Sequence, residues 1–336
     1  MLYSLIRARR FIAFDPRDKV YALLGIPKEG IEGKARFNPV YGNRSVAETY
    51  KLAAVQILED SNDLLLLAHA EGENFRMIYS LPSWVPDWSC TQIVGLGVTG
   101  YTRFDASRGL CRSLHINEEN NTLTVKGMKL DDIIRIAETK DEILEGNPFL
   151  QLLDLLCAIP RPYHKTKSKQ SPSEVLWRSL ITDTAGEDRI PPAASAYEHA
   201  FSAWFRPKMD KVKHRIGEAS FSEASRILNA DLPLSSGNCL EAHANVTEAE
   251  EYETVFAHSL HLRPFLTSKQ YFGIGSQSLR EKDSIWIIAG SRVPLILRKN
   301  ETQVETFQIV GGSYVHGFMN GEALEPDYSL EDIILV

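Results

Sequence analysis

Apolar residues in the first part of the chain recur at the spacing of an amphipathic helix. The clearest case follows Ser45, where Val46, Tyr50 and Ala53 would line one face. Glu48 lies three residues after Ser45, a capping-box pattern that predicts a helix beginning there. The run "LLLLAHAEG" is short, so its pattern allows either a buried strand or the buried end of a helix. "LPSWVPDWS" contains two prolines and predicts irregular structure.

The stretch "FDPRDKVYALLGI" predicts the start of a shorter helix. Asp15 is a favourable N-cap, Pro16 suits the first helical position, and Asp18 would face the positive end of the helix dipole. Gly25 is placed to end this helix in the left-handed conformation. Because capping accounts for both acids, we interpret the charges of this stretch as structural rather than catalytic.

From about Ser113, the spacing of apolar residues changes to a period of two, which is typical of strands. The pattern predicts a strand, a polar turn at 118–121 and a longer strand bent near Gly127. Residues 141–261 read as helical again, with "SPSE" at 171–174 as another capped helix start. Strands then return in "YFGIGS", "DSIWIIAG", "VPLILRK" and "TFQIVGGSYVHG".

These elements predict an α+β fold with a helical N-terminal region and a small antiparallel β module, barrel-like or sandwich-like, interrupted by a helical insertion. The expected segments are a helical region at 1–105, a first β-hairpin at 106–140, the insertion at 141–262, the remaining strands at 263–322 and a C-terminal tail at 323–336.

Composition narrows the class of protein. The chain has 336 residues and a formal net charge of -7, which argues against a nucleic-acid partner. The basic tracts "HKTKSK" and "RPKMDKVKHR" lack interleaved aromatics and read as solvated surface. The four cysteines are far apart and form no Cys-x-x-Cys pair, so we expect no metal site, no cofactor and a cytoplasmic location. Neither a secretory signal nor an apolar run long enough for a membrane span is visible.

Three motifs bear on catalysis. "GLGVTG", Gly95–Gly100, matches a dinucleotide fingerprint but lacks the strand before it and the helix after it. His258 and His261 have helical spacing but no third metal ligand nearby. Ser313 and His316 in "GGSYVHG" approach a nucleophile motif, yet their spacing in a strand would place them on opposite faces. A hydrolase or nucleotide-processing enzyme using the Gly95–Gly100 loop or Ser313 with His316 is the alternative to a non-catalytic protein.

The aromatic loop "WVPDWS" allows two interpretations. Its tryptophans would anchor a recognition surface, or they would fill the space between helical and β parts, and we favour the second. Arg17 would act as a clamp between domains if it had a buried partner. The candidates for an interface or a structural role are Asp15, Arg17, Asp18, Trp84, Asp87 and Trp88.

Several stretches, in this order, resemble the C-terminal region of fungal heterokaryon-incompatibility proteins. They are "DPRDKVYALLGI", "SVAETYKLAAVQILED", "LLLLAHAEG", "LPSWVPDWS", "EVLWRSLITD", "AYEHAFSAWF" and the terminal strand blocks, including "IVGGSYVHGFMNGEAL". The family's N-terminal signature domain carries a "SY-W-G"-like block and an "R-W-x-x-Q-E"-like block, and neither occurs here.

The resemblance implies a role in self/non-self recognition when unlike hyphae fuse. It implies the regulatory or recognition half of such a protein, which binds protein partners or holds an effector part in check. The lack of a long apolar run predicts that no membrane is among the partners. A truncated gene model, a split gene, a shortened paralogue and a fragment without stable function all stay open as origins of the chain.

Overall fold

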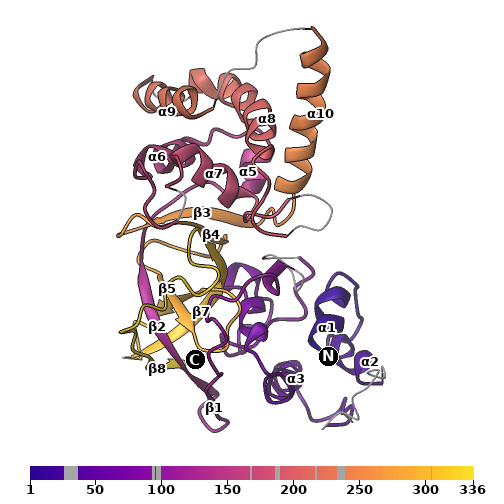
Figure 1. Ribbon diagram of the computed structural model, residues 1–336. Helices are drawn as coiled ribbons and strands as arrows, with labels where there is room; N and C mark the ends of the chain where they lie inside the picture. Colours follow the sequence, from indigo (N-terminus) through magenta and orange to yellow (C-terminus); the bar gives the residue numbers. More distant parts are fainter. Residues whose placement is uncertain are drawn as a thin grey trace. The chain divides into compact units, whose positions relative to one another are not determined.

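The computed structural model divides the chain into two compact units (Figure 1). Unit 1 comprises Met1–Leu130, Asp283–Ser313 and Asn320–Val336, and unit 2 comprises Asp131–Lys282 and Tyr314–Met319. The structure describes residues 1–25, 37–92, 95, 100–166, 169–185, 190–215, 218–232, 239–303 and 305–336.

The fold is α+β, as predicted, with N-terminal helices and a six-stranded antiparallel β-barrel interrupted by helices. The barrel strands follow the order β2-β3-β4-β7-β6-β5, and β5 pairs again with β2. Strand β1 pairs with β2 in the predicted hairpin, and β8 pairs with β2 and β7. The strands are β1 Leu114–Asn117, β2 Thr122–Ile136, β3 Leu262–Thr267, β4 Phe272–Ser276, β5 Ser284–Ile288, β6 Leu295–Lys299, β7 Thr306–Val315 and β8 Glu331–Leu335.

Two strands were missed by the periodicity. Strand β3 contains Pro264, which pairs with Ile274 in β4, and a proline inside an apolar run argues against a strand. Strand β8 lies in the stretch expected to be a C-terminal tail. It is recognisable in the structure by its antiparallel register with β2 and its short parallel register with β7.

The glycine in β2 has a role other than the expected bend. Strand β2 runs through Gly127 without interruption, and its register irregularity lies between Ile133 and Arg135. A Cβ on Gly127 would lie 2.9 Å from the Ile287 carbonyl oxygen and 2.6 Å from the Ile288 side chain. Gly127 therefore permits a close approach of β2 to its neighbour.

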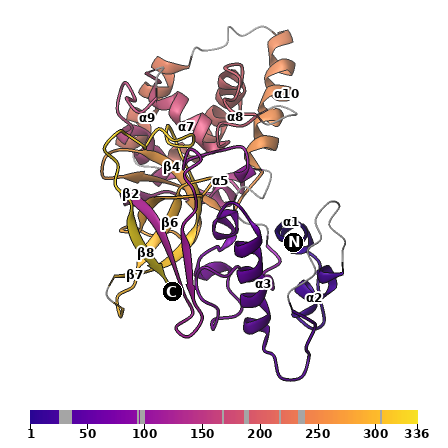
Figure 2. The ribbon, with the colours of Figure 1, turned by 60° about the horizontal axis from the view of Figure 1, so that its bottom comes forward.

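In the described residues of the N-terminal part of unit 1, the helices are α1 Leu2–Ala8, α2 Asp18–Leu24 and α3 Val46–Asp60, and the 3₁₀ turns are η1 Leu65–His69 and η2 Glu73–Phe75. Figure 2 shows α3 with α1 and α2 to one side of it. The capping box of α3 is confirmed, since Ser45 accepts the Glu48 N–H and Glu48 accepts the Ser45 N–H. The "LLLLAHAEG" run is the buried 3₁₀ helix η1.

The predicted start of α2 is wrong; its end at Gly25 is confirmed, but the conformation expected for that glycine is wrong. The helix begins at Asp18, with Arg17 as its N-cap residue and no side-chain cap. Asp15 instead accepts the Arg17 N–H at 3.0 Å, so its carboxylate caps the turn that leads into the helix. Gly25 has φ -86° rather than a left-handed conformation.

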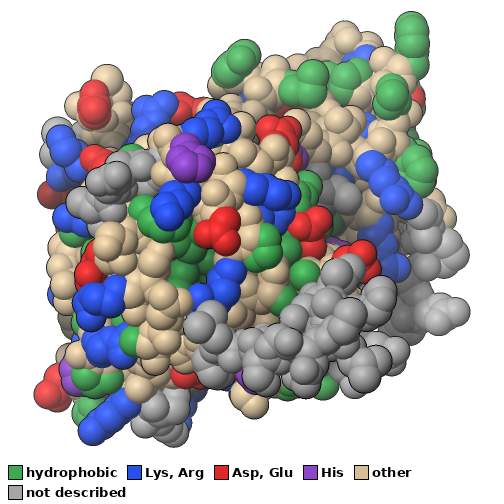
Figure 3. Space-filling model, turned by 90° about the horizontal axis from the view of Figure 1, so that it is seen from above, with side chains coloured by type: hydrophobic (Ala, Val, Ile, Leu, Met, Phe, Trp, Pro, Cys, Tyr) green, Lys and Arg blue, Asp and Glu red, His purple; other side chains and the backbone are tan. Residues whose placement is uncertain are grey.

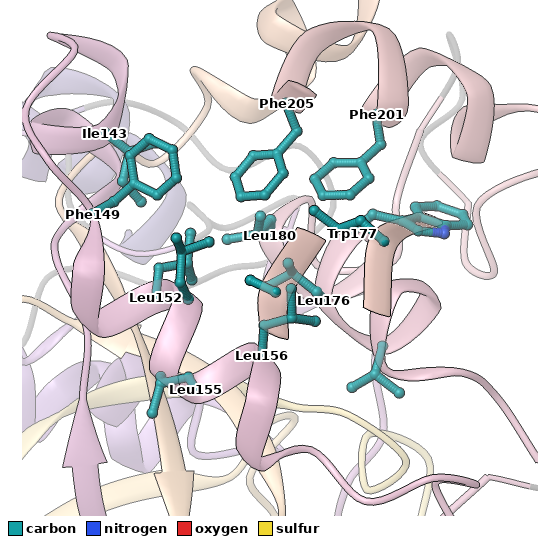
Figure 4. Close-up of a cluster of buried hydrophobic side chains, with 14 of the residues drawn as sticks. Ile143, Phe149, Leu152, Leu155, Leu156, Leu176, Trp177, Leu180, Phe201 and Phe205 are labelled. Atoms are coloured by element: carbon teal, nitrogen blue, oxygen red, sulfur yellow. The ribbon is translucent and has the colours of Figure 1, made fainter. Parts of the chain in front are cut away.

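Unit 2 carries the predicted helical insertion: α5 Lys140–Leu144, α6 Leu150–Ala158, α7 Pro172–Leu180, α8 Tyr197–Val212, η3 Lys213–Arg215, α9 Glu218–Asp231 and α10 Cys239–Phe256. The predicted cap of α7 is confirmed, since Ser171 accepts the Glu174 N–H and Pro172 occupies the first turn. Leucines of α6 and α7 face Phe201 and Phe205 of α8 in the core of this unit (Figure 4).

Candidate functional site

A buried ion pair lies under the tryptophan loop of unit 1. Nη1 of Arg9, directly after α1, donates to Oε2 of Glu71 at 2.6 Å, and both side chains are almost fully buried. Nη2 of Arg9 donates to the Asp87 carbonyl oxygen at 3.1 Å. The guanidinium lies 5.8 Å from the ring centroid of Trp88. Arg9 therefore joins the end of α1 to two later segments, at Glu71 and at the loop.

Asp87 organises the loop itself. One carboxylate oxygen accepts the N–H groups of Met77 and Ile78 at 2.7 and 2.8 Å, and the other accepts the Ser89 N–H at 2.8 Å. Its side chain is buried, so these three backbone donors replace the water that an aspartate normally binds. Asp87 thus acts as a structural tie within the loop.

Both candidate tryptophans of this loop are buried. Trp84 donates from its indole nitrogen to the Asn121 carbonyl oxygen at 3.0 Å, in the turn between β1 and β2. Trp88 packs beside Arg9. Neither ring is available to a partner in this conformation, which favours the structural interpretation of the loop.

The electrostatics of this cluster are set by burial. Burial raises the pKa of Glu71 to about 7, and the attraction of Arg9 offsets only part of that effect. Burial and then the Arg9 charge lower the pKa of His69 to about 3, so this histidine is neutral. Four buried polar atoms of the cluster have no hydrogen-bond partner among the described residues: Arg9 Nε, His69 Nε2, Glu71 Oε1 and Trp88 Nε1.

The charges at the start of α2 hold the segment before α3. Arg17 forms an ion pair with Asp15, with Nη2 2.7 Å from Oδ2, and donates to the carbonyl oxygens of Tyr41 and Arg44. Asp18 accepts the Tyr41 hydroxyl at 2.6 Å. Arg17 is therefore a clamp, but all its partners lie within unit 1 and are only partly buried.

Lys19, for which the sequence suggested no role, fixes the loop between α1 and α2. Its ammonium donates to the carbonyl oxygens of Arg9, at 2.8 Å, and Phe11. This loop presents three large apolar side chains to solvent: Phe11 is 62%, Ile12 92% and Phe14 107% exposed. Arg9 thus contributes its side chain to the buried pair with Glu71 and its carbonyl oxygen to the contact with Lys19 at the base of the exposed loop.

Comparison with known proteins places the chain in a family. Residues 125–336, more than half of the chain, match the Het-6 beta-barrel domain. The chain belongs to this family. It is also 23% identical, over 355 aligned residues, to heterokaryon incompatibility protein 6, OR allele, of Neurospora crassa. That alignment covers 95% of this chain and 50% of the Neurospora protein, so the chain spans about half the length of this relative. No solved structure matches.

In this Het-6 beta-barrel protein, Ser313 and His316 are both engaged elsewhere. The Ser313 hydroxyl donates to the Pro294 carbonyl oxygen at 3.0 Å. The two ring nitrogens of His316 lie 2.8 Å from the Tyr314 hydroxyl and 2.6 Å from Oε1 of Gln170. His316 thus has no ring nitrogen left for Ser313, and the pair does not form the nucleophile–base contact that hydrolysis requires.

The other motifs offer no assembled site. Residues 96–99 of the Gly95–Gly100 motif lie outside the described residues, and a Cβ on Gly95 would overlap the Tyr101 hydroxyl. His258 and His261 lie in the turn after α10 rather than on a helix face. Within the described ranges, no group of three His, Cys, Asp or Glu side chains is placed to hold a metal ion.

Two further observations concern the surface. On the face shown in Figure 3, basic and acidic side chains are interspersed, and the expectation of no nucleic-acid partner stays a prediction. In the part of the chain that the structure describes, no helix is long and apolar enough to cross a membrane.

The sequence did not single out Arg9, Glu71 or Lys19. Arg9 sits in "RARRF", where four neighbouring positions carry three arginines and all resemble solvated surface. Glu71 ends the apolar run "LLLLAHAE", and a charged residue directly after a buried run was the one available signal. Pairing the two requires contacts across 62 positions, which local patterns do not contain.

Proposed function

We propose that this chain is the non-catalytic recognition or regulatory portion of a heterokaryon-incompatibility-like protein in fungal self/non-self recognition, acting through contacts with other proteins. The family match and the similarity to the Neurospora protein support the biological setting. The observation that carries the proposal is the exposed loop 11–14 of unit 1.

The loop has the composition of an interface anchor. Phe11, Ile12 and Phe14 lie within four consecutive positions and expose most of their apolar surface. Clustered exposed apolar side chains mark interaction surfaces, and aromatic residues commonly dominate binding energy.

The loop is also fixed before any partner arrives. Lys19 binds two of its carbonyl oxygens, and Arg9 at its base is tied to Glu71. A loop that is already ordered loses less conformational entropy on binding than a mobile one. This arrangement suits recognition better than a loop that must fold on its partner.

The test uses the full chain and the N-terminal signature domain of an incompatibility protein from the same genome. Binding is measured by biolayer interferometry for the wild type and for a variant with Phe11→Ser, Ile12→Ser and Phe14→Ser. We expect the triple variant to bind at least about tenfold more weakly, because each anchor contributes on the order of 1 kcal/mol.

The matched control is Ile190→Ser, which removes a similarly exposed apolar side chain from unit 2. It should bind like the wild type. Absence of binding by a folded wild-type chain, or equal binding by the triple variant, would contradict the proposal.

A further inference from the structure

A second exposed element of unit 1 lies just before the tryptophan loop, in the turn formed by residues 76–82. The Leu81 N–H donates to the Ile78 carbonyl oxygen at 3.3 Å, which closes the turn. The Arg76 guanidinium donates to the carbonyl oxygens of Leu81 and Pro82, each at 2.8 Å. The backbone of this turn is therefore held by its own side chain as well as by its own peptide groups.

The turn presents two large apolar side chains to solvent. Met77 is 67% and Tyr79 85% exposed, although the backbone N–H of Met77 is bound by the buried Asp87. Loop 11–14 shows the same combination of an ordered backbone and exposed apolar side chains, which favours recognition of a partner. The tryptophan loop thus supports an exposed surface even though its own rings are buried.

Asp87 connects this turn to loop 11–14. Its carboxylate accepts the Met77 N–H, and its carbonyl oxygen accepts Nη2 of Arg9, which lies two residues before Phe11. Within unit 1, the turn and the loop are therefore separated by one arginine side chain and one aspartate. A standard interface covers about 800 Å² on each partner, which is wide enough to include both elements.

Positive charge adjoins the loop. Arg7 and Arg10 are exposed, and neither has an ion pair among the residues that the structure describes. The Lys19 ammonium lies at the base of the loop, where it binds two carbonyl oxygens and keeps its charge. The carboxylate that directly follows the loop, that of Asp15, is already paired with Arg17. A partner with carboxylates opposite the two exposed arginines would complement this charge.

We propose that a single acidic protein partner engages the loop and the turn together. Its apolar recesses receive the side chains of the loop and those of Met77 and Tyr79, and its carboxylates face Arg7 and Arg10. The inference rests on the proposed function, because it uses the same loop for a protein contact. It adds the turn as a second contact and names the charge of the partner.

The distribution of charge favours a protein over a lipid surface. The free arginines lie on the loop side only, whereas beside the turn Glu73 pairs with Arg298 and Arg76 is bound to carbonyl oxygens. An anionic bilayer presents negative charge evenly, but a protein surface can place carboxylates opposite the arginines alone.

The first experiment tests the turn, with the full chain and the same signature domain in biolayer interferometry. The double variant Met77→Ser with Tyr79→Ser should bind at least about tenfold more weakly, because it removes two apolar anchors. Both side chains are exposed and the backbone bonds to Asp87 remain, so the fold should be retained, as far-UV circular dichroism would show. The matched control is Tyr328→Ser, an exposed tyrosine of unit 1 outside these segments, which should bind like the wild type.

The second experiment tests the charge of the partner. The double variant Arg7→Gln with Arg10→Gln should lower the association rate about fivefold, and binding should depend less on salt than for the wild type. Arg215→Gln, the same change at an exposed position of unit 2, should alter neither quantity.

The possible outcomes separate the two proposals. If the turn variant or the arginine variant binds like the wild type while the triple loop variant is weakened, this inference is wrong and the proposed function stands. A folded wild-type chain that does not bind the domain refutes both. Binding to vesicles of phosphatidylcholine and phosphatidylserine that is lost in the same variants, with no binding to the domain, would assign the surface to lipid and overturn the protein partner.

Discussion

The helical core of unit 2 and the N-terminal part of unit 1 are stabilised by different means. In unit 2, Phe201 stacks on Phe205 with ring centroids 4.9 Å apart and meets Tyr252 at 5.3 Å. In unit 1, the segments around the exposed loop are joined by the buried Arg9–Glu71 pair. An apolar cluster loses stability in proportion to the volume removed, whereas a buried ion pair depends on both partners being present. The stability of the N-terminal part of unit 1 therefore depends on the charge state of Arg9 and Glu71.

The largest effect is expected from the apolar core. Phe201→Ala removes a fully buried ring from a close-packed aromatic cluster and should cost about 4 kcal/mol of unfolding free energy. Chemical denaturation followed by far-UV circular dichroism measures this loss. A cost below about 1 kcal/mol would mean that the cluster is loosely packed.

Breaking the ion pair should cost somewhat less, and the loss should be recoverable. Arg9→Ala leaves Glu71 buried without its cation, and we expect a loss of about 3 kcal/mol at neutral pH. The double variant Arg9→Met with Glu71→Leu replaces both charges by apolar groups and should restore most of the stability. If the double variant is no more stable than Arg9→Ala, the pair is not the tie described above.

The pH dependence of unfolding should report the charge state of Glu71. Because the pKa of Glu71 is raised to about 7 from 4.5, the folded chain holds more protons on this group than the unfolded chain between those values. The contribution of Glu71 is therefore fully present below pH 4.5 and is lost as the pH rises through 7, at up to about 1.4 kcal/mol per pH unit.

Thermal denaturation of the wild type and of Glu71→Gln across this pH range measures the effect. The stability of the glutamine variant relative to that of the wild type should increase as the pH rises, and this difference should become constant above pH 7. The lowered pKa of His69 acts in the opposite direction, with stability lost as the pH falls, but it is common to both proteins and cancels in the difference. A difference that is constant with pH would contradict the assignment.

The smallest effects are expected where the two regions are alike. Ser45 caps α3 in unit 1 and Ser171 caps α7 in unit 2, each by accepting the N–H three residues on. Replacement of either serine by alanine should cost about 1 kcal/mol. Denaturation midpoints of the two variants measure the losses, and a loss at only one position would show that the caps are not equivalent.

The extent to which the sequence predicted the structure also differs between unit 1 and unit 2. The helices of unit 2, the hairpin of β1 and β2 and most later strands were predicted, because apolar periodicity reports local burial. The caps at Ser45 and Ser171 were predicted because they involve residues three apart. Strand β3 was missed because Pro264 interrupts its pattern.

The candidate site was only partly predictable. The composition of the loop drew attention to Asp87 and the tryptophans, but composition alone does not determine whether these side chains are buried. The exposure of Phe11, Ile12 and Phe14 was not expected, because apolar residues before a helix normally enter a core. Arg9 with Glu71 could not be found, since a buried ion pair between distant segments leaves no local pattern.

The division of unit 1 into three stretches bears on how the chain is made. Residues 131–282 supply nearly all of unit 2 as one continuous stretch, so its helices are synthesised together and reach their partners early. Unit 1 needs β8, and the Val336 carbonyl oxygen directly after this strand accepts the Ser83 N–H beside the tryptophan loop. Residues 1–130 of unit 1 therefore complete their packing only after β8 has been synthesised.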